Sequence, residues 1–125
     1  MKFTIALICI LFFATCAAAD WTVIRNYEFV SYYAEKETMN KSGNIVSMWV
    51  LESYKYTRYY LGGKFFRSTK RLIRYDCQNK LSAVRQFIHY FDQMANGVPV
   101  ADRIYEKEDW KPIVSGSVGE RSWRI

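Results

Sequence analysis

Short runs of aromatic and β-branched residues recur along most of the chain, and turn-forming residues separate them. Residues 21–25 and 27–33 predict two strands or one bent strand. A turn is predicted at residues 41–44. The run 45–51 that follows is apolar at odd and even positions alike, which predicts a strand that is covered on both faces. Residues 52–66 are rich in tyrosine and contain two adjacent glycines, so they predict a long hairpin or excursion.

The second half of the chain contains one ambiguous segment. Residues 70–77 resume a strict alternation and predict another strand. The run 81–95 has apolar residues at helical spacing, whereas its aromatic and β-branched content favours a strand, and the pattern alone leaves both open. Residues 93–97 predict a hairpin connection into a strand over residues 98–105.

A helix-start signature lies near the end of the chain. Ser117 is followed three residues later by Glu120, which is the spacing of a capping box. We therefore expect a short terminal helix over residues 118–124, with Val118 and Trp123 directed toward the rest of the fold.

The N-terminus has the pattern of a targeting segment. A basic start and an apolar run over residues 3–14 are followed by alanines, which is typical of a cleaved secretory signal peptide. We expect residues 1–19 to be removed and residues 20–125 to form one domain. A second route is open, because the sequence that ends at Cys16 loosely resembles a lipoprotein box whose cysteine would be acylated.

Cysteine usage changes once the leader is removed, because Cys77 is then the only cysteine of the domain. A single cysteine cannot form a disulfide within its own chain, so it is either a buried thiol or an intermolecular link. Cys77 shares one face of its predicted strand with Arg71, Ile73 and Tyr75, which favours the buried thiol.

The sequence offers little catalytic chemistry. His89 is the only histidine, so no metal site has the necessary spacing, and a nucleophile pair of Cys77 with His89 lacks an oxyanion motif. We treat His89 as an ordinary strand residue near the basic segment. The acids Glu106, Glu108 and Asp109 predict a solvated turn. We expect a protein that is not an enzyme and needs neither a cofactor nor a metal.

Positive charge is concentrated in the middle of the chain. The protein has a formal net charge of +6, yet nine basic residues lie between Lys55 and Arg85, where Asp76 is the only acid. Aromatic residues interleave with these cations, which predicts a basic aromatic face for an acidic glycoprotein or a glycosaminoglycan. The alternative is a solvated sheet edge, whose charges protect it from aggregation. A nucleic acid ligand would fit the charge but conflicts with the predicted signal peptide. The candidate ligand-binding residues are Lys55, Tyr56, Arg58, Tyr59, Tyr60, Lys64, Arg67, Lys70 and Arg74.

The closing run over residues 110–123, WKPIVSGSVGERSW, is too specific for a general packing rule to produce it. Together with the loop at residues 90–97 and the strand at residues 44–51, it resembles the surface adhesin protein E family of Gram-negative bacteria. The residues that carry this family pattern are Asp76, Cys77, Gly97, Trp110, Pro112, Gly116, Ser117, Gly119, Glu120 and Trp123.

The resemblance implies an α+β fold, with an antiparallel β-sheet of about six strands and a short C-terminal helix packed on one face. It also implies that residues 81–91 are a strand. The family typically has a cysteine after its terminal tryptophan that pairs with the position of Cys77, and this sequence has none after Trp123. We therefore expect a more labile terminal helix and a Cys77 that is available for an intermolecular disulfide in a homodimer.

The resemblance also implies a function. Members of the family are exported to the periplasm or the outer-membrane surface, and characterised relatives bind host matrix glycoproteins, notably laminin and vitronectin. The expected function is therefore adhesion to such glycoproteins or to glycosaminoglycans. The alternative is a periplasmic or outer-membrane-associated structural or interaction protein with no host ligand.

Overall fold

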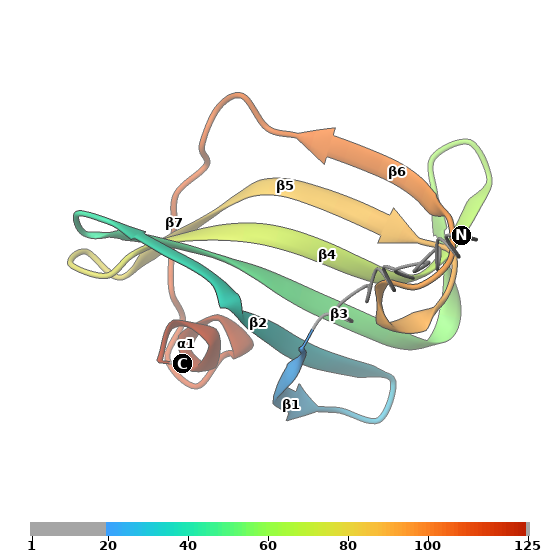
Figure 1. Ribbon diagram of the computed structural model, residues 1–125, viewed down its shortest axis with the longest axis horizontal. Helices are drawn as coiled ribbons and strands as arrows, with labels where there is room; N and C mark the ends of the chain where they lie inside the picture. Colours follow the sequence, from blue (N-terminus) through green and yellow to red (C-terminus); the bar gives the residue numbers. More distant parts are fainter. Residues whose placement is uncertain (1–19, 125) are drawn as a thin grey trace, which may run out of the picture.

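The computed structural model describes residues 20–124, which form one curved antiparallel sheet and a short terminal helix (Figure 1). The predicted signal peptide and the lipidation at Cys16 lie outside the described residues. The strands are β1 (Thr22–Asn26), β2 (Val30–Ser42), β3 (Ile45–Tyr60), β4 (Lys64–Asp76), β5 (Leu81–Tyr90), β6 (Pro99–Ile104) and β7 (Lys111–Pro112). The remaining elements are a 3-10 turn, η1 (Gln93–Ala95), and the helix α1 (Val118–Trp123).

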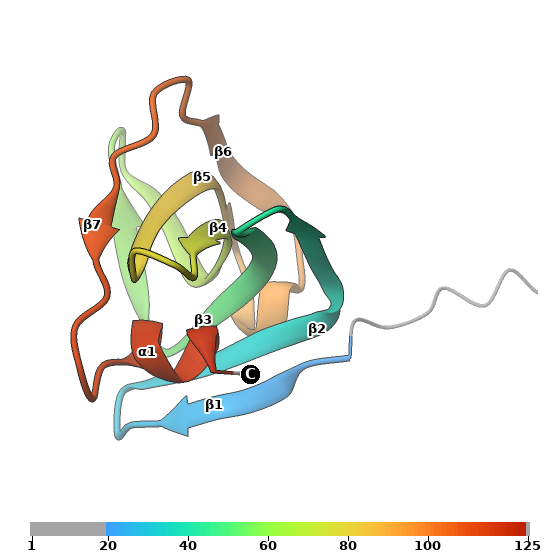
Figure 2. The same ribbon diagram turned by 90° about the vertical axis from the view of Figure 1, so that its left-hand side faces the viewer.

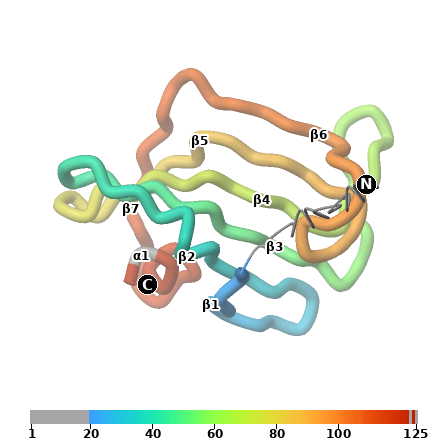
Figure 3. The backbone as a smooth tube through the Cα atoms, in the orientation of Figure 1, coloured from blue at the N-terminus to red at the C-terminus, as the bar shows by residue number. Residues whose placement is uncertain are grey.

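The sheet is a meander in which each strand pairs with the next along the chain, from β1 to β6. β6 pairs with the last residues of β5 and β7 with the first, so both lie on the same edge of β5. The connections β1–β2, β3–β4 and β5–β6 therefore meet at one end of the sheet, on the right in Figure 3. This end brings together segments that are far apart in the sequence.

The structure confirms the predicted fold class, and it shows that the ambiguous run is a strand, β5. A register shift in the β4–β5 pairing explains the helical spacing. Val84 lies opposite Ile73 and Phe87 lies opposite Arg71, so one extra residue is accommodated between them on β5. A β-bulge of this kind shifts the alternation by one, and residues three apart then share a face.

The tyrosine-rich residues 52–66 are the distal parts of β3 and β4 with the turn between them, as predicted for a long hairpin. Residues 21–33 form two strands rather than one bent strand. The predicted connection at residues 93–97 is not a simple hairpin turn, because η1 folds back over the sheet there.

The core lies on the concave face of the sheet, where α1 covers it (Figure 2). Ile24, Met48 and Tyr75 are among its buried residues, and Ile113 and Val118 pack against them. The predicted helix start is confirmed, because the Ser117 hydroxyl accepts a hydrogen bond from the Glu120 N–H at 3.2 Å. The side chain of Trp123 is outside the described part of the structure.

Cys77 is half-buried and packs against the same core cluster, with no disulfide partner among residues 20–124. Burial of the thiol was the favoured prediction, and the contact with the core agrees with it. The intermolecular disulfide stays a prediction.

Candidate functional site

The tip of the β3–β4 hairpin is built by two glycines. Gly62 and Gly63 have φ angles of +83° and +76°, which residues with a side chain adopt only with strain, and the Gly63 N–H donates to the Tyr60 carbonyl. The turn pairs Tyr60 with Lys64 and Tyr59 with Phe65 across the two strands. A register shift between Ser53 and Arg58 bends β3 just before this tip.

Seven of the nine predicted ligand-binding residues lie together at this end of the hairpin, and we call them the basic hairpin. They are Lys55, Tyr56, Arg58, Tyr59, Tyr60, Lys64 and Arg67. Tyr56 and Tyr59 are 60% and 73% exposed, and the neighbouring Leu61 is 81% exposed. Within residues 20–124, no ion pair engages a cation of the basic hairpin.

Aromatic contacts hold these cations near the surface. The Lys55 ammonium lies 5.6 Å from the Tyr56 ring, and the Arg58 guanidinium lies 4.8 Å from the Tyr54 ring. Arg67 has a different role, because it donates to the Lys55 carbonyl and thereby ties the two strands at the bend. Tyr60 points to the concave face, where its ring lies 5.0 Å from that of His89.

Lys70 does not belong to the basic hairpin, so the structure does not bring it together with the other seven residues. It lies farther along β4, on the convex face. Its ammonium is 4.8 Å from the Trp49 ring, 5.5 Å from the Trp21 ring and 3.9 Å from the Glu35 carboxylate. An indole on each side and a carboxylate partner leave little of this charge for a ligand.

Arg74 is also separate from the basic hairpin, because it forms an ion pair with Glu108 and lies over the Trp110 ring. This contact corrects one expectation. Glu108 was predicted to lie in a solvated turn with Glu106 and Asp109, but it is half-buried and also accepts a hydrogen bond from Trp110 Nε1 at 2.9 Å. The aromatic platform of Trp110 brings the opposite charges together, and sequence spacing does not reveal this.

A buried polar network on the concave face was not predicted. Arg71 forms an ion pair with Glu52, which also accepts a hydrogen bond from the Tyr54 hydroxyl. Burial, followed by the Glu52 charge, raises the pKa of Tyr54 to about 12. Burial lowers the pKa of Arg71, but the Glu52 carboxylate outweighs this and the net pKa is raised. Arg71 therefore serves the fold, although it lies within the basic segment.

His89 belongs to the same buried region. Its ring stacks on Phe66 with centroids 3.9 Å apart, and its Nδ1 lies 2.8 Å from the Thr69 hydroxyl. Burial, reinforced by the Arg71 charge, lowers its pKa to about 4, so the imidazole is neutral at pH 7. The prediction of an ordinary strand residue is confirmed for the strand, but the side chain is buried and does not lie on a basic surface.

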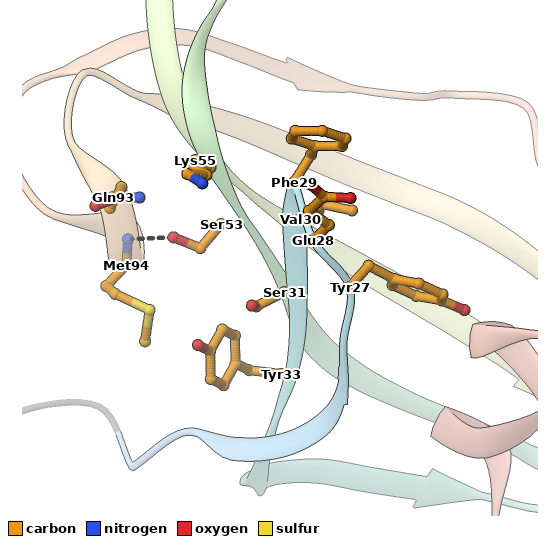
Figure 4. Close-up of a pocket in the computed structure, with 10 residues that line it drawn as sticks. All are labelled: Tyr27, Glu28, Phe29, Val30, Ser31, Tyr33, Ser53, Lys55, Gln93 and Met94. Atoms are coloured by element: carbon orange, nitrogen blue, oxygen red, sulfur yellow. Dashed lines mark hydrogen bonds between the residues drawn. The ribbon is translucent and has the colours of Figure 1, made fainter.

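A groove of about 340 Å³ adjoins the basic hairpin on the convex face (Figure 4). Ser31 and Ser53, which pair across β2 and β3, lie within it, and Tyr33 stands beside them. Gln93 and Met94 of η1 form the facing wall, and Lys55 connects the groove to the basic hairpin. No local pattern predicts this groove, because it requires contacts between residues about 40 positions apart.

Several residues of the family pattern occupy turns and caps. Asp76 accepts hydrogen bonds from the Gln78 and Asn79 N–H groups, and these bonds, led by the one from the Asn79 side chain, lower its pKa. Gly97 has a φ of +78°, and a Cβ there would lie 2.5 Å from an Asp92 carboxylate oxygen. These positions therefore shape the ends of strands and the loop that carries η1.

Within residues 20–124, no three His, Cys, Asp or Glu side chains are placed to hold a metal ion. No helix in that part of the chain is both long and apolar enough to cross a membrane.

The architecture defines a class: a single antiparallel meander sheet with a C-terminal helix in its curve. The crystal structure of protein E from non-typeable Haemophilus influenzae shares this fold, with a TM-score of 0.63 and 18% identity over 82% of this chain and 72% of that one. A second structure of Haemophilus influenzae protein E gives a TM-score of 0.62 and 16% identity, over 86% of each chain. No curated protein sequence matches significantly.

The chain belongs to the Surface-adhesin protein E family, whose pattern matches residues 21–125. Membership supports a surface adhesin.

Proposed function

We propose that this protein is an exported adhesin that binds an acidic host partner, either a matrix glycoprotein such as laminin or vitronectin or a glycosaminoglycan, through the basic hairpin. The observation that carries the proposal is that the cations of the basic hairpin form no ion pairs within residues 20–124. Lys55, Arg58 and Lys64 therefore have no acidic partner in that part of the chain, and Lys55 lies over the exposed Tyr56 ring whereas Arg58 lies over the buried Tyr54 ring. Free cations beside aromatic faces favour sulfate or carboxylate groups on a glycan or an acidic protein surface.

Charge reversal tests the proposal directly. In the triple variant Lys55→Glu, Arg58→Glu, Lys64→Glu, we expect affinity for immobilised heparin, laminin or vitronectin to fall at least tenfold at low salt. The salt dependence of the remaining binding should flatten, because fewer ion contacts are screened.

The matched control reverses three exposed lysines that lie away from the basic hairpin: Lys36, Lys41 and Lys107. Both triple variants carry the same net charge, so a general effect of basicity would weaken them equally. Equal affinity of the hairpin variant and the control variant would reject the basic hairpin as the binding site.

Location at the cell surface is part of the same proposal. Trypsin added to intact cells should cleave the protein in the exposed hairpin, where Arg58 and Lys64 are accessible. Cells permeabilised before digestion provide the control. Protection in intact cells together with cleavage in permeabilised cells would favour the periplasmic structural protein with no host ligand.

A further inference from the structure

The convex groove beside the basic hairpin has the chemistry of a carbohydrate subsite. Its volume of about 340 Å³ lies within the range of small-molecule sites. Ser31, Ser53 and Tyr33 point into one space from the sheet, opposite Gln93 and Met94 (Figure 4). The groove is therefore walled by two segments that are distant in sequence and floored by small side chains.

The hydrogen-bonding groups of the groove are side chains with unused capacity. Among residues 20–124, no hydrogen bond engages the hydroxyls of Ser31 and Tyr33, in contrast to Ser53, whose oxygen accepts the Met94 N–H at 3.2 Å. The Ser53 hydroxyl proton remains free to donate to a ligand. The Gln93 amide donates to the Tyr54 carbonyl at 2.8 Å, which leaves its own carbonyl oxygen as an acceptor.

The backbone of the floor is not available to a ligand. Ser31 pairs with Ser53 across β2 and β3, and with Asn26 on the other side, so no free strand edge lies in the groove. A peptide that binds by adding a strand to a sheet therefore has nothing to pair with here. A ligand held by hydroxyl, amide and aromatic side chains fits better, which is the recognition that a sugar ring requires.

The groove lining contains one cation, Lys55, and one acid, Glu28, and only the cation belongs to the basic hairpin. Lys55 and Phe29 line the groove (Figure 4), and the Phe29 ring lies 5.8 Å from the ring of Tyr56 in the basic hairpin. We propose that the groove holds one sugar residue of an acidic glycan, with its sulfate or carboxylate toward Lys55 and its hydroxyls toward Ser31, Ser53 and Tyr33. This inference rests on the proposed function, because the basic hairpin would bind the remaining sugar residues of the same glycan.

The test uses two variants that alter the groove and leave the cations in place. Ser31→Phe fills the floor, and Tyr33→Phe removes one hydroxyl while keeping the ring. The control Ser47→Phe places the same bulk on the convex face of β3, at the other end of the sheet. The probes are a size-defined heparin tetrasaccharide, a hyaluronan tetrasaccharide and poly-glutamate, which has the charge without the sugar.

We expect Ser31→Phe to weaken tetrasaccharide binding about tenfold and Tyr33→Phe to weaken it about threefold, while poly-glutamate binds both variants like the unmodified protein. In NMR titrations, both tetrasaccharides should shift the amide signals of Ser31, Ser53 and Met94. Poly-glutamate should shift only signals of the basic hairpin.

The sugar subsite would be overturned if Ser31→Phe bound the tetrasaccharides as tightly as the unmodified protein does. It would also be overturned if Ser31→Phe and Ser47→Phe lost the same affinity. In either case, the basic hairpin would still bind all three probes, so the proposed function would stand. Shifts of the groove amides by poly-glutamate would also overturn it, since the groove would then accept an acidic peptide. If none of the three probes binds the unmodified protein, the proposed function itself fails.

Discussion

The two halves of the β3–β4 hairpin contain the same kinds of residue and use them in opposite ways. In the half near the helix, Arg71 is half-buried, paired with Glu52 and linked to the Tyr54 hydroxyl. In the half near the turn, Arg58 and Lys64 have no acidic partner within residues 20–124, and Tyr56, Tyr59 and Phe65 of this half are exposed. Arg58 reaches back over the buried Tyr54 ring at 4.8 Å. Arginine and tyrosine thus stabilise the fold at one end and remain available for binding at the other.

The position of the acidic residues decides between these two roles. A cation that leaves water is stable only beside a carboxylate, and Glu52 supplies this partner for Arg71. Within residues 20–124, no acid from any strand forms an ion pair with Lys55, Arg58 or Lys64, and these three side chains are exposed to solvent. A charge count along the sequence treats both halves alike, but only the second half is a candidate surface for an acidic ligand.

The largest expected effect comes from breaking the buried pair. Replacement of Glu52 by Ala leaves the Arg71 charge and the Tyr54 hydroxyl without their partner, so we expect a loss of roughly 4 kcal/mol in the free energy of unfolding. Urea denaturation of the purified domain measures it. The double variant Glu52→Leu, Arg71→Met should recover most of that loss, because no unpaired charge remains.

A loss below about 1 kcal/mol for Glu52→Ala would contradict the comparison, since that value is typical of an exposed pair. The two halves of the hairpin would then not differ in how they hold their charges.

Acid should also destabilise the buried half. The pKa of His89 is about 4 in the folded protein and about 6.5 in the unfolded chain, so the unfolded state binds the proton first as the pH falls. The neutral ring therefore contributes its full stabilisation above pH 6.5. As the pH falls toward 4, this contribution to the free energy of unfolding, about 3 kcal/mol, is lost. Arg71 opposes protonation of this ring, and Glu52 favours it.

Urea denaturation at several pH values checks this expectation against His89→Phe, which keeps the aromatic stack on Phe66 and has no titrating group. The variant should show a flatter dependence of stability on pH between 6.5 and 4. Parallel pH profiles for the two proteins would assign the acid sensitivity to other groups.

The sequence predicted the parts of this structure that depend on local pattern. The meander of strands follows from short apolar runs between turns, and the helix start follows from the spacing of Ser117 and Glu120. The alternation in residues 70–77 already placed Arg71 on the core face with Ile73 and Tyr75. That observation was the available signal that Arg71 differs from the other cations.

The rest of the candidate site depends on partners that are distant in sequence. Lys70 is neutralised by Glu35, and Arg74 by Glu108, and both pairs form only when the strands or the β6–β7 connection are in place. The groove likewise requires η1 to reach Ser53. No charge run or local spacing encodes these contacts, so the predicted nine-residue face divides into a seven-residue hairpin and two paired cations.

Arg74 is intermediate between the two halves of the hairpin in how exposed its ion pair is. Its side chain and that of Glu108 are 33% and 25% exposed, and Arg74 also lies over Trp110. Replacement by Met keeps much of the aliphatic contact and removes the charge, so we expect a loss of about 1 kcal/mol in stability. Thermal unfolding of this variant is compared with that of Lys107→Met, because Lys107 is exposed and forms no ion pair within residues 20–124. Equal melting temperatures would place Arg74 with the free cations.

The smallest expected effect on stability is at the lysines of the basic hairpin. Reversal of Lys55, Arg58 and Lys64 to Glu removes no ion pair among residues 20–124, so the free energy of unfolding should change by less than about 0.5 kcal/mol at each lysine. At Arg58, which lies over the buried Tyr54 ring, the loss of the cation–π contact should cost about 1 kcal/mol. The same urea denaturation used for Glu52→Ala provides the comparison. A loss near 4 kcal/mol would show that these cations hold the fold as Arg71 does. A small change beside a large loss of heparin binding would separate recognition from stability within two adjacent strands.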